Sequence, residues 1–396
     1  MARKLNSWLA GLKQYVENTE APRQFWLWSG IFTISSAMQR KVWLPFGMEN
    51  IYPNLYILTV APPAARKALP ASLAKKMLLE IGVRVSRDST SRRAITKELA
   101  KIGTEEVFQL PDGTPQSQSA MAVISKEMSS LLMINPKEVI EILTDLYDSY
   151  DIWDLGLKDE EDKLYNICLG CYIATTPTWL TENLPESSVG GGYTSRNIIV
   201  WGDEVYKRVT LPSLTKQQTD IYSALIHDLS HIHTIIGPFK WDKEAYAIFD
   251  NWYQNIDQKI RTVKDQRLHP FIGRMHICIL KTAMTLRIDY SDSLILTPPE
   301  ITRSIEMMEE VLATASNALG GHGPSRYAAE IYRVRMQIQM LKQTTFRNLL
   351  AMNLNHLIRS ELKEVIETLA GAGLIRLEPL GTGNDYLVLW KGEKKG

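Results

Sequence analysis

The sequence is poor in cysteine, has no excess of charge of either sign and lacks a long apolar run. Its three cysteines are too few for a disulfide-stapled scaffold, and their odd number indicates a reducing compartment. The 45 basic and 44 acidic residues leave a net charge of +1, which excludes a wholly basic nucleic-acid coat but allows a local basic patch. The most apolar early stretch, residues 25–38, is shorter than the roughly 20 residues of a membrane-spanning helix. We therefore expect a cytoplasmic protein without a signal peptide or membrane contact.

Two short patterns of cysteine and histidine do not lead to a metal site. Cys168 and Cys171 form a C-x-x-C motif inside an apolar run and without a second pair, so two buried thiols are the favoured interpretation. His227 and His231 have the i, i+4 spacing of zinc ligands, but no motif supplies a third ligand. We assign no metal-ligating residues.

Length and composition indicate a globular protein of two or three domains. At about 150 residues per domain, 396 residues suggest this number. The 45% hydrophobic and 22% charged residues exclude intrinsic disorder and a fibrous repeat.

Apolar strands alternate with helical segments in the first half of the chain. Residues up to about 49 have a helical pattern, and a polar, turn-rich loop is expected at 111–118. Five strands are expected at 55–61, 83–87, 120–125, 166–176 and 198–201, with helices at 69–80, 92–102 and 138–150. Continuous apolar runs separated by helices predict an α/β fold with a parallel sheet and crossover helices.

The second half is predicted to be helical, with a small domain at its end. Helices are expected at 216–236, 242–264, 269–287 and 299–319, and the glycine-rich residues 320–324 end the last of these. The tail has helical patterns at 327–341, 344–352 and 355–370, then strands at 374–378 and 386–390 around a turn at 381–384. Three helices followed by a hairpin predict a winged helix, which binds either DNA or protein. The predicted domains are 1–50, a helical segment; 51–212, the sheet core; 213–326, a helical lid; and 327–396, the winged helix.

The loop after the first strand is the first candidate site. Residues 61–68 read Ala-Pro-Pro-Ala-Ala-Arg-Lys-Ala, and a strand, a tight loop, a lysine and a helix are the layout of a phosphate-binding loop. Backbone N–H groups of this loop, which includes the candidate ligand-binding residues Ala65, Arg66 and Ala68, and the N-terminus of the following helix would face the phosphates, while Lys67 would neutralise their charge. The glycines and the hydroxyl of the usual P-loop are missing, so an ordinary strand-to-helix loop remains the alternative.

Three further polar residues lie near strand ends in the order that ATP hydrolysis requires. Glu127 follows the third strand and could polarise the attacking water, although Lys126 stands where a metal-binding acid is usual. Thr176 ends the fourth strand and could sense the γ-phosphate. Arg196 follows the glycines at 190–192 and suits an arginine finger that reaches a neighbouring subunit. Each feature has an ordinary structural alternative, but their joint placement favours an ATPase.

Two groups of basic residues could neutralise nucleic-acid phosphates regardless of sequence. The first surrounds one helix start and consists of Arg84, Arg87, Arg92, Arg93 and Lys97. The second lies in the predicted winged helix and consists of Arg359 and Lys363, with Arg347 nearby. From residue 331 onward, 10 basic and 6 acidic residues give a net charge of 10 − 6 = +4, so the tail is the basic part of a nearly neutral chain.

Residues from about 25 to 290 resemble a family of phage and mobile-element P-loop proteins, which are related to phage replicative helicases and primase-helicases. The resemblance rests on residues 51–56, the Arg66-Lys67 loop, residues 89–93, residues 174–177 and residues 191–196. It implies a RecA-like or AAA-plus-like core, ATP and Mg²⁺ as ligands, and a homo-oligomeric ring such as a hexamer on DNA in a bacterial host cell. It also implies that Lys67 is the phosphate lysine, Glu127 the strand-end acid, Thr176 the sensor and Arg196 the finger.

Two functions follow from these features. The first is a DNA-dependent ATPase of phage or mobile-element replication that is helicase-like. The second is a decayed P-loop protein that binds DNA, or loads a replication partner, without ATP turnover. The departures at Ala61, Arg66, Ala68 and Lys126 favour the second function, whereas the order of the strand-end residues favours the first.

Overall fold

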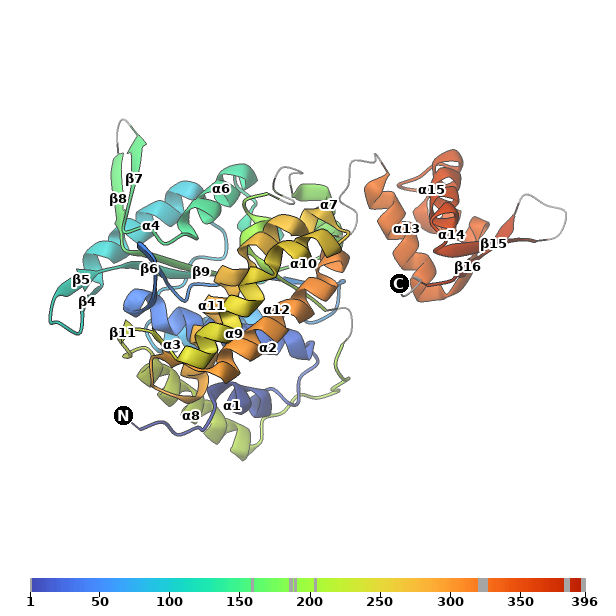
Figure 1. Ribbon diagram of the computed structural model, residues 1–396. Helices are drawn as coiled ribbons and strands as arrows, with labels where there is room; N and C mark the ends of the chain where they lie inside the picture. The colour runs from blue at the N-terminus through green and yellow to red at the C-terminus, as the bar shows by residue number, and fades with distance from the viewer. Residues whose placement is uncertain are drawn as a thin grey trace. The chain divides into compact units, whose positions relative to one another are not determined.

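The computed structural model describes residues 2–157, 160–184, 188, 191–202, 205–319, 327–380 and 385–392 (Figure 1). The chain is a mixed α/β protein that divides into two compact units. The first consists of residues 1–176 and 187–318, and the second of residues 177–186 and 319–396. The helical start, the sheet core and the helices up to residue 318 thus belong to one compact unit.

A four-stranded parallel sheet forms the centre of the first unit. Its strands are β10 (Ile198–Trp201), β3 (Tyr56–Val60), β9 (Ile167–Thr175) and β6 (Ser119–Ser125), in this order across the sheet. Every residue of these strands is buried, as their continuous apolar runs predict for a sheet covered on both faces. Of the five expected strands, four are confirmed. The expected strand at 83–87 is reduced to one parallel bridge between Val85 and Ala122 on the far side of β6.

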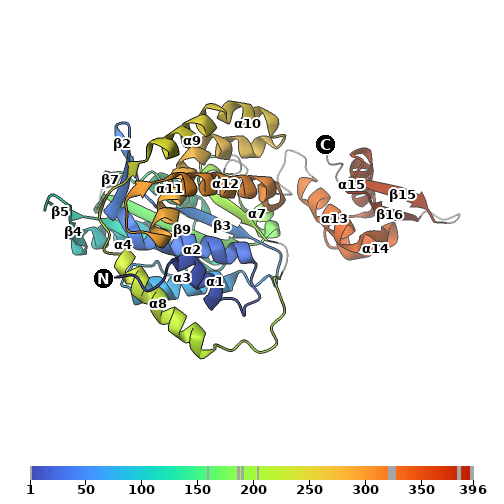
Figure 2. The same cartoon turned by 60° about the horizontal axis from the view of Figure 1, so that its bottom comes forward.

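Helices cover both faces of this sheet, and alternate side chains of its strands show which helix lies where. In β9, the Tyr172 hydroxyl donates to the Phe25 carbonyl of α2 (Arg23–Met38), so this face lies against α2. In β3, the Tyr56 hydroxyl donates to the Leu143 carbonyl of α6 (Pro136–Leu146) on the opposite face. Tyr56 pairs in register with Cys171, the neighbour of Tyr172, so the two tyrosines point to opposite faces. Figure 2 shows α1, α2 and α3 close together beside the sheet.

The remaining helices of the first unit begin where the sequence supplies caps. Ser7, Ser91, Thr215 and Asp242 each accept a backbone N–H of the first turn that follows. The helices are α1 (Trp8–Tyr15), α3 (Ala68–Glu80), α4 (Arg92–Glu105), α5 (Met128–Leu131), α8 (Lys216–Ile232), α9 (Lys243–Gln254), α10 (Ile256–Thr262), α11 (His269–Tyr290) and α12 (Pro298–Ala318). Short 3₁₀ turns are η1 (Gln39–Lys41), η3 (Thr194–Arg196) and η4 (Gln266–Leu268). No helix in the described part of the chain is long and apolar enough to cross a membrane.

Small strands occur where the sequence predicted helix or loop. The helical reading up to residue 49 is wrong beyond η1, because β1 (Val42–Phe46) and β2 (Glu49–Ile51) form a hairpin around Gly47, whose φ is +64°. The loop expected at 111–118 contains β5 (Pro115–Ser117), which pairs with β4 (Val107–Gln109). The other short strands are β7 (Ile152–Leu157), β8 (Glu160–Tyr165), β11 (Gly237–Pro238), β12 (Lys240–Trp241) and β13 (Ile295–Leu296).

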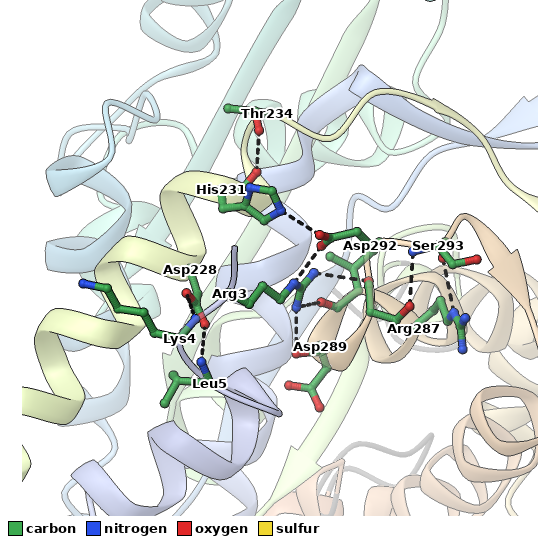
Figure 3. A network of polar contacts seen from close by, with 12 residues as sticks. Arg3, Lys4, Leu5, Asp228, His231, Thr234, Arg287, Asp289, Asp292 and Ser293 are labelled. Carbon is green, nitrogen blue, oxygen red and sulfur yellow. Dashed lines mark hydrogen bonds and ion pairs between the residues drawn. The ribbon is translucent and has the colours of Figure 1, made fainter. Parts of the chain in front are cut away.

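Polar contacts fasten the N-terminal residues to α8 and α11 (Figure 3). The Asp228 carboxylate of α8 accepts the backbone N–H groups of Lys4 and Leu5, each at 2.8 Å. Arg3 donates to the carbonyls of Ile288, Asp289 and Ser291 at the C-terminus of α11, and its Nε donates to Asp292. These contacts fix the start of the chain and the helix α1 that follows it. His227 and His231 donate to or accept from Asp228 and Asp292, respectively, and belong to this network.

The second unit contains the helices and the hairpin expected in the tail. Its elements are α7 (Pro177–Asn183), α13 (Ala328–Leu341), α14 (Phe346–Asn353), α15 (Arg359–Gly371), β14 (Gln343–Thr345), β15 (Ile375–Pro379) and β16 (Tyr386–Trp390). The strands form an antiparallel sheet in the order β14-β16-β15, of which β14 was not expected. The buried core of this unit includes Val334, Ile338, Leu349, Leu362 and Val388. The turn expected at 381–384 and the glycine-rich residues 320–324 lie outside the described residues.

Candidate functional site

The strongest candidate site lies at the edge where the parallel strands end. The chain leaves β3 toward the bridge at Val85, beyond β6, whereas it leaves β9 toward β10, on the other side of β3. Connections that depart in opposite directions from neighbouring strands leave a crevice at their carboxyl ends, and ligands of open α/β sheets bind there. The loop 61–68 follows β3, and Thr176 follows β9, so both lie at this switch point of the sheet.

The backbone of the 61–68 loop forms an arc of N–H groups. Ala64 and Arg66 have φ values of +68° and +56°, a left-handed conformation that costs a residue with a Cβ atom some energy. Among the described residues, no hydrogen-bond acceptor pairs with the backbone N–H groups of residues 64–67. Lys67 then enters the right-handed region and caps α3, so the loop leads directly into a helix N-terminus. Left- and right-handed residues in succession form a nest that binds anions, and the helix dipole adds to it.

The Lys67 side chain contacts the start of this loop. Its ammonium donates to the carbonyls of Ala61 and Pro62 at 3.4 Å each, distances at the long limit of hydrogen bonding. Burial lowers the pKa of Lys67, and the negative charge of Glu127 opposes this shift. The half-buried cation is therefore held by two long contacts and one nearby carboxylate, which leaves it able to bind a phosphate.

The other loop residues have structural partners that local sequence does not reveal. Arg66 is exposed, and its Nε donates to the Glu20 carboxylate at 2.7 Å, while the N–H of Val209 donates to the same carboxylate. The hydrogen bonds from Val209 and Arg66 lower the pKa of Glu20. Ala65 is buried beneath the loop, and Ala68 is the first residue of α3. Glu20 thus connects the 61–68 loop, through Arg66, to the backbone at Val209.

The end of β9 contacts the same loop. The N–H of Ala61 donates to the Thr175 carbonyl at 3.2 Å, which places Thr176, the next residue, beside the start of the loop. Thr176 is partly exposed at this edge. The structure therefore brings Thr176, Lys67 and Glu127 together at one edge of the sheet, as the sequence predicts.

The acids at this edge are Glu127 and Asp88. Glu127 is exposed and stands before α5, and its side chain accepts no capping hydrogen bond. Asp88 was missed by the sequence analysis, although it directly follows the expected strand 83–87. A hydrogen bond from Lys75 at 2.7 Å lowers the pKa of Asp88, and the charge of Lys126 adds to the effect. Asp88 is therefore held by Lys75, whereas the Glu127 carboxylate makes no capping hydrogen bond.

The residues at this edge do not make a magnesium site of their own. Ala68 has no hydroxyl to offer, Lys126 is cationic, and Asp88 is bound to Lys75. In the described part of the chain, no three acidic, histidine or cysteine side chains gather as metal ligands would. We assign no protein ligand to Mg²⁺.

Arg196 lies at the opposite edge of the sheet, and its expected placement with the other site residues is wrong. It belongs to η3, which precedes β10, and parallel strands begin at the edge opposite to the one where they end. Its NH2 group donates to the Asp148 carboxylate at 2.7 Å, and its NH1 group donates to the Gly192 carbonyl. With its side chain only 10% exposed, Arg196 has an intramolecular role as an ion-pair partner. Gly190, the first of the loop glycines, lies outside the described residues.

The residues of the first basic group differ in their ion pairs and in their exposure. Arg84 is paired with Glu105 at 2.7 Å and with Glu106 at 3.4 Å, which reduces its value for binding phosphates. Arg87 is exposed directly before Asp88, and Arg92 is the first residue of α4. Arg93 and Lys97 are exposed further along the same helix. Of this group, Arg87 and Arg92 lie closest along the chain to the edge that holds Lys67.

The second basic group is exposed on the second unit. Arg359 starts α15 and lies 6.0 Å from the centre of the Phe346 ring, and Lys363 is one turn further along. Lys363 is within 3.8 Å of Glu367, an exposed i, i+4 pair of small energetic weight. These two residues share one face of α15 because of their spacing.

Neither a protein-family model nor a curated protein matches this sequence. The function must therefore be inferred from the sheet edge itself.

Proposed function

We propose that the chain is a nucleotide-dependent DNA-binding protein, a helicase-like ATPase of phage or mobile-element replication. The observation that carries this proposal is the nest at residues 64–67, whose N–H groups have no acceptor among the described residues, with Lys67 beside it at the switch point between β3 and β9. Triphosphates match this arrangement, because it offers several N–H donors, a helix N-terminus and one cation. ATP would bring Mg²⁺ on its own phosphates.

The order of the strands supports a RecA-like or AAA-plus-like P-loop core. Numbered along the chain, the five parallel segments lie in the order 5-1-4-3-2 across the sheet. The lysine loop thus follows a central strand, and Glu127 follows a strand two places away. This arrangement suits the core that the family resemblance implies, and a ring of subunits is part of the same proposal.

The second unit supplies the DNA-binding part of the proposal. Three helices and the sheet β14-β16-β15 match the arrangement of a winged helix, with β15 and β16 as the wing. Residues 331–396 carry a net charge of 10 − 6 = +4, and Arg359 and Lys363 are exposed on α15. The proposed contacts are to phosphates, because Glu361, Glu364 and Glu367 on the same helix oppose base reading.

The first test is phosphate release from ATP by the full chain, with Mg²⁺, in the presence and absence of single-stranded DNA. DNA-stimulated release is the expected result. ATP binding without release would support the alternative of a protein that assembles on DNA without turnover, for which Ala68 and Lys126 are the supporting departures. If neither ATP nor inorganic tripolyphosphate binds, both the ATPase and the alternative without ATP turnover are wrong.

Glu127→Gln is expected to lower phosphate release by about 10²–10⁴-fold, the usual contribution of a positioned general base. Its carboxylate lies near Lys67 and has no capping partner, so the substitution removes a charge without breaking a structural contact. ATP affinity should change by less than about threefold, since binding rests on the loop. Steady-state kinetics and equilibrium ATP binding measure the two effects separately. Glu138→Gln, an exposed acid of α6, is the matched control, and equal rates for both variants would exclude Glu127 as the base.

A further inference from the structure

A cavity of about 730 Å³ lies between α1 and the start of α2. Its floor is apolar and includes Leu12, Val16 and Trp26, all of which are buried. Its rim is polar and includes Lys13 and Arg23. Ligand sites for small organic molecules have this size and this combination of an apolar floor with a few polar groups.

The cavity borders the edge of the sheet that holds the lysine loop. Gln24, which lines the cavity, donates from its amide to the Trp201 carbonyl at the end of β10. The next N–H, that of Gly202, donates to Val60, the last residue of β3 before the loop. Glu20, directly after the lining residue Thr19, accepts the hydrogen bond from Arg66. Two short chains of contacts thus connect the cavity wall to the phosphate loop.

The cavity wall offers what a flat aromatic ring needs. Tyr206 is 42% exposed and stands at the rim, where the Arg23 guanidinium lies 4.0 Å from the centre of its ring and donates to its hydroxyl. Aromatic rings and guanidinium planes are the groups on which nucleobases stack. Trp26, which is 6% exposed, adds an aromatic ring to the floor of the cavity.

We infer that this cavity binds the purine base of the nucleotide whose phosphates lie on the 61–68 loop. The inference rests on the proposed function, since it concerns the same ligand. The base then lies against α1, the start of α2 and Tyr206, outside the sheet core. Glu20 and Arg66 form the connection between the base and phosphate parts of the site.

The experiment compares ATP, UTP and inorganic tripolyphosphate as probes for the full chain by calorimetry. ATP is expected to bind at least about tenfold tighter than tripolyphosphate, because stacking of one base contributes about 1–3 kcal/mol. Ala10→Trp places a large side chain on the exposed rim of the cavity and should remove that advantage while tripolyphosphate affinity stays unchanged. Ala351→Trp, at an exposed position of α14, is the matched control and should leave all affinities unchanged.

A second pair of variants tests the stacking surface without filling the cavity. Tyr206→Ala should weaken ATP about tenfold and tripolyphosphate not at all, whereas Tyr206→Phe keeps the ring and should stay close to the original protein. If ATP and tripolyphosphate bind equally and Ala10→Trp has no effect, the base site is overturned while the phosphate site stands. UTP binding as tight as that of ATP would overturn the purine assignment. Absence of binding by all three probes would overturn the proposed function and this inference with it.

Discussion

Lys67→Ala is expected to weaken ATP binding by about 10²-fold. The ammonium makes only two long contacts, to Ala61 and Pro62, and it is half-buried above the nest. A charge-assisted hydrogen bond contributes about 1.5–3 kcal/mol, and 2.7 kcal/mol corresponds to roughly a hundredfold in affinity. The alanine variant keeps the N–H groups of the loop, so residual binding should persist. Phosphate release, where it occurs, should fall below detection at ATP concentrations that saturate the original protein.

The measurement is equilibrium binding of ATP and of tripolyphosphate by calorimetry. Both ligands should lose affinity equally, because Lys67 contacts the phosphates and not the base. Lys76→Ala is the matched control, since Lys76 is exposed on the same helix and lies 4.6 Å from the Tyr222 ring, not at the loop. If the Lys67→Ala and Lys76→Ala variants bind ATP and tripolyphosphate with equal affinity, Lys67 does not contact the phosphates and the proposed site has lost its main cation.

The core strands could be predicted because burial on both faces leaves a local mark. A strand such as β9 has nine consecutive buried residues, and its apolar run is bounded by turns. The hairpin of β1 and β2 could not be predicted in this way. Its first strand follows η1 without a break and pairs on its other side with β11, almost two hundred residues further along the chain. Strand β14 is only three residues long and pairs with β16 more than forty residues later.

The site was predictable to the extent that it depends on strand ends. Lys67, Glu127 and Thr176 each lie just after a strand that the sequence reveals, and parallel strands bring such residues to one edge. Arg196 follows a glycine loop but precedes strand β10. Because β10 runs parallel to β3, a residue before β10 lies at the edge where the strands begin, opposite to Lys67, Glu127 and Thr176.

Long-range ion pairs were not predictable from local pattern. Glu20 binds Arg66 across 46 residues, and Asp148 binds Arg196 across 48 residues. Neither pair has a spacing that a helix or a hairpin would produce. Each decides whether an arginine is available to a ligand, which is why the functional interpretation of both arginines needed the structure.

The second substitution with a large expected effect lies where Asp228 of α8 binds the backbone of Lys4 and Leu5. Asp228→Ala is expected to lower the free energy of unfolding by about 2–4 kcal/mol, because the variant removes two charge-assisted hydrogen bonds, from the N–H groups of Lys4 and Leu5. Asp228 is only 1% exposed, and its carboxylate accepts hydrogen bonds from the N–H groups of Lys4 and Leu5.

The effect should extend to α1 because the same segment is held at a second point. Asp289 of α11 accepts from the Ser7 hydroxyl and from the N–H of Leu9, and the Trp8 indole donates to Leu225 of α8. Burial raises the pKa of Asp289, and the hydrogen bonds from Leu9 and Ser7 oppose the rise. Loss of the Asp228 contacts weakens the attachment of this segment to α8, so α1 should become accessible to protease before the rest of the unit unfolds.

The measurement combines thermal unfolding with limited proteolysis of the full chain. A loss of 2–4 kcal/mol corresponds to a fall in Tm of about 3–6 °C for a unit of roughly 300 residues. Asp220→Ala, an exposed acid of α8, should leave both readouts unchanged, and Asp228→Asn should fall between the two because it keeps one acceptor oxygen. Since α1 also forms one wall of the proposed base site, the Asp228→Ala variant should lose ATP affinity while tripolyphosphate affinity is retained. An unchanged Tm would show that residues 3–9 dock without these hydrogen bonds. A lower Tm with equal losses for ATP and tripolyphosphate would show that α1 supports the sheet edge as a whole, not the base alone.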